Sequence, residues 1–144
     1  MILRDEAATA RVGAALAKVV RPGDVIRLSG PLGVGKTALA RGLIEALGHE
    51  GEVPSPTYAI VQPYEELDPP VFHVDLYRIE DPSEIEELGL DSAADALLLV
   101  EWPERAGDKV WPEALSLSLE FGQNDDRILT AEVPRSWEGR WPPE

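Results

Sequence analysis

The stretch Gly30-Pro31-Leu32-Gly33-Val34-Gly35-Lys36-Thr37 decides the fold, because it matches the phosphate-binding pattern G-x-x-x-x-G-K-[ST] at every fixed position. In such a loop, successive backbone N–H groups point inward at the phosphates of a nucleotide. Glycine is needed where φ turns positive and where a side chain would collide with phosphate. The ammonium group of Lys36 is expected to reach the β/γ-oxygens, and the hydroxyl group of Thr37 to ligate Mg²⁺. The residues expected to bind the nucleotide here are Gly30, Gly33, Val34, Gly35, Lys36, Thr37 and Ala38.

The flanks of this stretch give the structural context that the pattern requires. Residues 25–29, Val-Ile-Arg-Leu-Ser, form a short β-prone run that predicts a buried strand. Downstream, Ala40, Leu43, Ile44 and Leu47 fall on one face of a helix, and Gly48 is a natural stop. Strand, loop and helix therefore favour a phosphate site over a glycine-rich turn that binds nothing. The fold class predicted is α/β, P-loop NTPase-like, with a mixed parallel and antiparallel sheet flanked by helices.

Length and composition predict one globular domain over residues 1–144. The chain is 44% apolar, has no run near the ~18 apolar residues that span a bilayer, and contains no cysteine. Disulfides, thiolate catalysis and Cys-ligated zinc are thereby excluded. The first ten residues carry both signs of charge and lack an apolar signal core, so a cytoplasmic location is expected, without membrane contact.

The net charge of −14, from 27 acidic and 13 basic residues, argues against a large nucleic-acid footprint. An acidic surface repels a phosphate backbone, so any work on RNA would pass through a partner. The simpler interpretation is that most of these charges only keep the protein in solution.

The remaining elements follow from hydrophobic periodicity and turn signals. Helices are expected after the N-cap candidate Asp5, after the glycine-rich stretch, and after Asp81. Strands are expected over residues 25–29, 58–64, 71–77, 96–100, 115–121 and 128–133. The last two strands form an antiparallel hairpin with Arg127 at its turn.

Three segments supply further candidate site residues. Ser55 and Thr57, held extended by two prolines, would lie beside the phosphates if the segment folds back; an ordinary proline turn is equally compatible with the spacing. Asp75 lies late in an apolar strand, where such enzymes place a second metal anchor. Glu101 follows the apolar run 96–100 and is a candidate for the Mg²⁺ shell or for orienting the attacking water. His73, in the same strand as Asp75, is interpreted as structural.

Taken together, these segments resemble the TsaE family, also called YjeE. The resemblance is carried by Gly30–Thr37, Arg41-Gly42-Leu43 with Ala46-Leu47-Gly48, Ser55-Pro56-Thr57-Tyr58, His73-Val74-Asp75-Leu76-Tyr77-Arg78 and Leu99-Val100-Glu101-Trp102-Pro103-Glu104. It covers most of the chain in the right order and weakens after about Arg105.

The resemblance implies a P-loop ATPase of tRNA threonylcarbamoyladenosine biosynthesis, which binds ATP with Mg²⁺. The implied partners are the TsaB and TsaD proteins, and tRNA is reached only through them. By the same resemblance, Lys36 and Thr37 hold phosphate and metal, and Thr57 belongs to a switch-like segment. Asp75 and Glu101 occupy the acidic positions around Mg²⁺, so Glu101, Thr57 and Asp75 are the expected catalytic residues.

Further positions follow from the resemblance alone. Trp102 matches a tryptophan beside the site, and Arg127 matches a loop position near the nucleotide. Asp5 and Glu6, at the start of the first helix, lie where the family has residues near the adenine.

Two other functions remain open on the sequence. A small-molecule kinase would need an acceptor pocket and usually an arginine-bearing lid, whereas residues 81–95 are acidic. A nucleotide-sensing module would bind without hydrolysis, and the role of Glu101 separates it from an ATPase.

Overall fold

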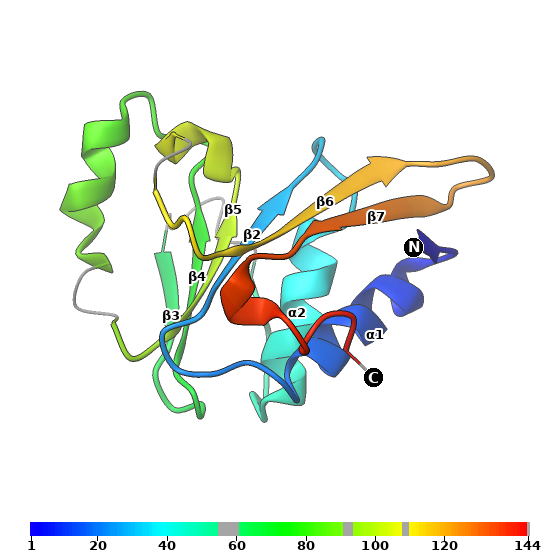
Figure 1. Ribbon diagram of the computed structural model, residues 1–144, viewed down its shortest axis with the longest axis horizontal. Helices are drawn as coiled ribbons and strands as arrows, with labels where there is room; N and C mark the ends of the chain where they lie inside the picture. The colour runs from blue at the N-terminus through cyan, green and yellow to red at the C-terminus, as the bar shows by residue number, and fades with distance from the viewer. Residues whose placement is uncertain (55–60, 91–93, 108–109, 144) are drawn as a thin grey trace.

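The computed structural model describes residues 1–54, 61–90, 94–107 and 110–143, which form one mixed sheet with helices on its faces (Figure 1). The strands are β1 (Ile2–Leu3), β2 (Val25–Ser29), β3 (Val61–Tyr64), β4 (Val71–Asp75), β5 (Leu97–Glu101), β6 (Leu115–Phe121) and β7 (Arg127–Glu132). The α-helices are α1 (Glu6–Leu16) and α2 (Lys36–Ala46), and the 3₁₀ helices are η1 (Pro82–Leu88), η3 (Pro103–Ala106) and η4 (Arg135–Trp137).

The sheet order is β1-β7-β6-β2-β5-β4-β3, with the phosphate-loop strand β2 at its centre. β2 pairs in parallel with β5 and β6, and β4 pairs in parallel with β5. The outer pairs β3–β4, β6–β7 and β1–β7 are antiparallel. The predicted α/β class with a mixed sheet flanked by helices is therefore confirmed.

Both faces of the sheet are covered around β5, which explains its uninterrupted apolar sequence. Leu97 and Leu99 pack on the face that carries α1 and α2, in one cluster with Leu39 and Leu43. The alternate residues of β5 face the opposite side, where they join a second cluster with Val74, Ile79 and Ala106. Figure 1 shows α1 and α2 side by side below the sheet, and η1 at its far end.

Most expected elements are present, with shifted ends. Asp5 caps α1, because its carboxylate accepts a hydrogen bond of 2.7 Å from the N–H group of Ala8. The strand expected over 71–77 ends at Asp75, and the one expected over 96–100 runs one residue further, to Glu101. Of the strand expected over 58–64, residues 58–60 lie outside the described residues. The strand β1 was missed, because two residues carry no periodicity.

Two glycines allow α1 and α2 to pack at close range, which the sequence analysis did not foresee. A Cβ atom on Gly13 of α1 would overlap the carbonyl oxygen of Leu39 in α2. Reciprocally, a Cβ atom on Gly42 of α2 would overlap the carbonyl oxygen of Ala10 in α1. The close approach joins the middle of α1 to the middle of α2.

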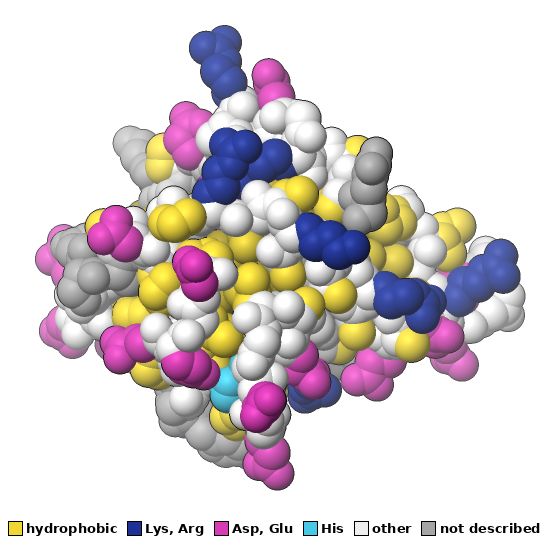
Figure 2. All heavy atoms as spheres, turned by 90° about the horizontal axis from the view of Figure 1, so that it is seen from below, with side chains coloured by type: hydrophobic (Ala, Val, Ile, Leu, Met, Phe, Trp, Pro, Cys, Tyr) yellow, Lys and Arg dark blue, Asp and Glu magenta, His cyan; other side chains and the backbone are white. Residues whose placement is uncertain are grey.

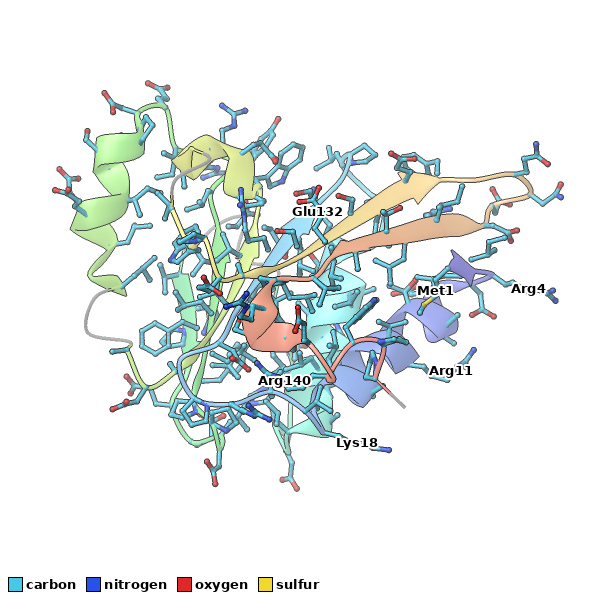
Figure 3. The ribbon with its side chains drawn as sticks, in the orientation of Figure 1. Met1, Arg4, Arg11, Lys18, Glu132 and Arg140 are labelled. Carbon is cyan, nitrogen blue, oxygen red and sulfur yellow. The ribbon has the colours of Figure 1, made fainter. Side chains whose placement is uncertain are left out.

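The C-terminal segment after β7 completes the core. Trp137 of η4 is fully buried, and the guanidinium group of Arg140 lies 4.0 Å from the centroid of its ring. Arg140 also pairs with Asp24, just before β2, at 2.7 Å. Figure 3 shows Arg140 turned toward the body of the protein, whereas Arg4, Arg11 and Lys18 extend outward. The sequence analysis had found no role for this tail, and its role in the fold is to anchor the chain before β2.

Charge is unevenly distributed on the edge opposite the phosphate loop. Figure 2 shows hydrophobic side chains at the centre of this edge, with Lys and Arg mainly above and to the right of them and Asp and Glu mainly below and to the left. The net charge of −14 therefore does not form a uniform acidic coat. No helix in the described part of the chain is long and apolar enough to cross a membrane.

His49 joins the segment after α2 to the connection between β3 and β4. Its Nδ1 atom lies 3.0 Å from a carboxylate oxygen of Glu66, and its Nε2 atom lies 3.0 Å from the carbonyl oxygen of Glu52. Both partners are acceptors, so both contacts are satisfied only when the ring is an imidazolium. The Glu66 carboxylate foremost, and the Glu52 carbonyl next, raise the pKa of His49.

We predict that Gly13→Ala destabilises the protein by about 1–3 kcal/mol, because overpacking outweighs the roughly 1 kcal/mol gain in helix propensity. Urea unfolding followed by circular dichroism measures the change. Ala7→Ser on the exposed part of α1 is the control and should stay within about 0.5 kcal/mol of the parent. A Gly13→Ala variant as stable as the parent would contradict the close contact.

For His49 we predict an imidazole pKa above the ordinary value of 6.5, measured by NMR titration. Because the pKa is raised in the fold, the stabilisation is full below 6.5 and is lost as pH rises through the folded value. Glu66→Gln removes the carboxylate and should return the pKa toward 6.5. An unchanged titration in that variant would show that Glu66 does not hold the ring.

Candidate nucleotide-binding site

One cavity of about 380 Å³ opens where the phosphate loop meets the ends of β4 and β5, the start of α1 and the β6–β7 turn. It is lined by Asp5, Glu6, Thr9, Leu32, Gly33, Val34, Gly35, Lys36, Thr37, Ala38, Arg41, Asp75, Glu101, Trp102, Asp125 and Arg127. Parallel strands place their carboxyl ends at one edge, which is where open α/β sheets hold ligands. The cavity is therefore in the position expected for a nucleotide site.

The phosphate loop adopts the backbone that its glycines allow. Gly30, Gly33 and Gly35 have φ values of 144°, 80° and 117°, which side chains disfavour. A Cβ atom on Gly30 would also lie 2.5 Å from the carbonyl oxygen of Leu119. Gly35 forms the N-cap of α2, so the free N–H groups of that helix face the cavity end of the loop.

The Lys36 side chain is buried and held by two protein groups. Its ammonium group donates a hydrogen bond of 2.5 Å to the carbonyl oxygen of Gly30, and it lies 3.6 Å from the centroid of the Trp102 ring. Burial lowers the pKa of Lys36, and the nearby carboxylates of Glu101, Glu104 and Asp75 oppose that change. The ammonium group has three N–H donors, so a phosphate group that entered the cavity would share it with a carbonyl and an aromatic face.

Thr37 and Glu101 meet across the cavity from separate elements. The Thr37 hydroxyl lies 3.3 Å and 3.2 Å from the two carboxylate oxygens of Glu101. Asp75 is paired with Glu101 in the β4–β5 register, and one of its carboxylate oxygens accepts a 2.8 Å hydrogen bond from the N–H group of Tyr77. A hydroxyl and two carboxylates are hard oxygen donors of the kind that Mg²⁺ prefers.

These donors fit a magnesium ion that is bound together with phosphate. Among the described residues, no three His, Cys, Asp or Glu side chains are grouped to hold a metal by themselves. Mg²⁺ is usually bound by one or two carboxylates together with substrate phosphates and water. Thr37, Asp75 and Glu101 match that incomplete protein shell.

His73 has a partner that the sequence analysis did not anticipate. Its Nε2 atom lies 2.6 Å from the Oε2 atom of Glu101, and the exposed fractions of the two side chains are 0% and 4%. His73 and Asp75 are two residues apart in a strand and so share a face. That spacing was the available signal that His73 points toward the site.

Arg127 connects the β6–β7 hairpin to the phosphate loop. Its Nε atom donates a 3.0 Å hydrogen bond to the carbonyl oxygen of Val34, and one terminal nitrogen donates to that of Asp125 at 2.8 Å. The guanidinium group lies 4.6 Å from the centroid of the Phe121 ring. Arg127, which was expected near the nucleotide, thus restrains the phosphate loop by binding a backbone carbonyl of that loop.

The sequence-predicted residues gather at this cavity with two exceptions. Gly30 does not line it, although its carbonyl oxygen receives the Lys36 ammonium. Thr57, with the proposed switch segment around Ser55, lies outside the described residues. Four lining residues had no expected role: Thr9, Leu32, Arg41 and Asp125. Of these, Arg41 of α2 pairs with Glu6 of α1 at 3.7 Å. No local sequence pattern predicts this contact between two helices.

A protein-family model described as threonylcarbamoyl adenosine biosynthesis protein TsaE matches residues 3–129. Curated relatives carry the name tRNA threonylcarbamoyladenosine biosynthesis protein TsaE. The protein of Streptomyces coelicolor is 42% identical over 118 residues, covering 79% of this chain and 80% of its own length. The Bacillus subtilis protein is 39% identical over 125 residues, covering 85% and 76%.

Among solved structures, the crystal structure of YdiB from Bacillus subtilis superposes with a TM-score of 0.80 and 28% sequence identity. The match covers 96% of this chain and 87% of that chain. The mixed sheet and its helices are therefore shared with a solved protein over almost the whole chain.

We predict that Arg127→Lys weakens ATP binding about fivefold, because the hydrogen bond to Val34 is worth about 1 kcal/mol. Calorimetry measures the affinity, and hydrogen exchange reports the amides of residues 32–35, which should exchange faster. Arg135→Lys, at an exposed position of η4, is the matched control. Weaker binding without faster exchange would show that Arg127 acts on the ligand and does not restrain the loop.

Proposed function

Because this chain belongs to the TsaE family of threonylcarbamoyl adenosine biosynthesis proteins, we propose that it is the ATP-binding and ATP-hydrolysing member of that machinery. The product of the pathway is tRNA that carries a threonylcarbamoyl group on adenosine 37. One observation carries the ATPase proposal: the phosphate loop, Asp75 and Glu101 line a single cavity.

The proposed roles follow from the chemistry of the side chains. The loop amides, the start of α2 and the Lys36 ammonium bind the phosphates. Thr37, Asp75 and Glu101 hold Mg²⁺, which when bound neutralises charge that develops on the phosphate oxygens. Glu101 also orients the attacking water and accepts its proton.

We propose that partner proteins bring the ATP-hydrolysing chain to tRNA. The net charge of −14 opposes direct binding of a large phosphate backbone. We therefore assign tRNA contact to the TsaB and TsaD proteins, with which this chain would form a heteromeric complex in the cytoplasm. Hydrolysis by the chain alone should be slow, and the pair should stimulate it.

Two substitutions test the site assignments. Lys36→Ala should abolish measurable ATP binding in calorimetry, whereas Lys18→Ala, at an exposed position in the turn after α1, should not change it. Glu101→Gln should retain ATP binding measured without Mg²⁺ and lose hydrolysis roughly 100-fold or more, as expected for loss of a general base. Glu120→Gln, at an exposed end of β6, is the control. Full hydrolysis by Glu101→Gln would refute its catalytic role.

The reaction itself is tested by following phosphate release with and without the TsaB and TsaD proteins. Faster release with the pair supports the proposal, and equal rates count against coupling. Transfer of the phosphoryl group to a metabolite would instead indicate a kinase, and binding without turnover under either condition would indicate a nucleotide sensor.

A further inference from the structure

The contact between His73 and Glu101 links a cavity-lining carboxylate to a buried side chain of the sheet. His73 lies in β4 and pairs with Leu99 of β5, two residues before Glu101. Its ring therefore reaches diagonally along the shared face of the two parallel strands. The distance between Nε2 and the Oε2 atom of Glu101 is 2.6 Å, with both side chains buried.

The chemistry of the partners fixes which nitrogen carries the hydrogen. A carboxylate only accepts hydrogen bonds, so the Nε2 atom of His73 is the donor. The Nδ1 atom has no hydrogen-bond partner within the described part of the chain.

The two oxygens of Glu101 are consequently in different situations. Oε2 receives the short bond from His73 and a longer contact, at 3.2 Å, from the Thr37 hydroxyl. For Oε1, the contact found among the described residues is the 3.3 Å one with that same hydroxyl. His73 secures Oε2, and because a carboxylate has about two lone-pair sites on each oxygen, Oε1 can bind a further group in the cavity even when it receives the Thr37 hydrogen.

We propose that His73 is the positioning residue that fixes the Glu101 carboxylate, by donating from Nε2 to Oε2, so that Oε1 faces the nucleotide and its metal. The inference rests on the proposed function, because it assigns Glu101 a role toward ATP and Mg²⁺. His73 itself does not line the cavity, so it acts through Glu101. Removing a residue that hydrogen-bonds a metal ligand typically lowers metal affinity or activity by about 10–100-fold.

Two variants separate positioning from packing. His73→Gln keeps a donor nitrogen the same number of bonds from the backbone, whereas His73→Leu fills the space without a donor. We expect His73→Leu to weaken Mg²⁺-dependent ADP binding and to lower kcat, each by about 10-fold or more. Binding of ADP without Mg²⁺ should stay within about twofold, and His73→Gln should restore most of both losses.

An independent measurement uses the protein without nucleotide. The chain has two histidines, so His49→Gln assigns the two imidazoles in a nitrogen-15 NMR spectrum. We expect the His73 signal to show hydrogen on Nε2, and Glu101→Gln to shift that resonance while leaving His49 unchanged. His49→Gln also serves as the activity control.

The outcomes are distinct. Hydrogen on Nδ1 alone, a Glu101→Gln spectrum without a shift, or equal Mg²⁺ dependence in all His73 variants would each overturn the inference. If His73→Leu fails to fold, the His73→Gln variant and the NMR measurement on the unmodified chain still decide it. If the parent neither binds nor hydrolyses ATP, the proposed function fails, and the NMR result still shows whether His73 holds Glu101.

Discussion

The parallel pairing of β2, β5 and β4 is the constraint on which the site depends. Parallel strands end at the same edge, so the phosphate loop after β2 and the carboxylates at the ends of β4 and β5 meet there. The register sets Asp75 opposite Glu101. A shift of one residue in either strand would turn its carboxylate to the other face of the sheet.

Burial of charge is the second condition that shapes this edge. Lys36, Asp75 and Glu101 are each less than 5% exposed, and an isolated charge at such a position is strongly unfavourable. Each has a partner: Lys36 has a carbonyl and the Trp102 ring, Asp75 an amide, and Glu101 a hydroxyl and an imidazole. The site is therefore held in shape by the same contacts that make its charges tolerable.

Packing at a distance from the cavity determines its outer wall. The close approach at Gly13 and Gly42 packs α1 against α2, and Glu6, at the start of α1, lines the cavity together with the phosphate loop. At the opposite edge, Arg140 binds Asp24 just before β2, so the C-terminal segment supports the central strand. The family match ends at residue 129, and this support comes from outside it.

The sequence by itself determined the strand–loop–helix unit, the α/β class and the residue types of the site, because glycine conformations, helix periodicity and strand runs are local properties. Only the tertiary structure decided which side chains meet. Thr37 and Glu101 are 64 residues apart, and His73 and Glu101 are 28 residues apart. Such contacts depend on strand order and register, which no local pattern encodes. His73 was thus interpreted as structural, and the roles of Gly13 and Trp137 were missed, since their partners lie on other elements.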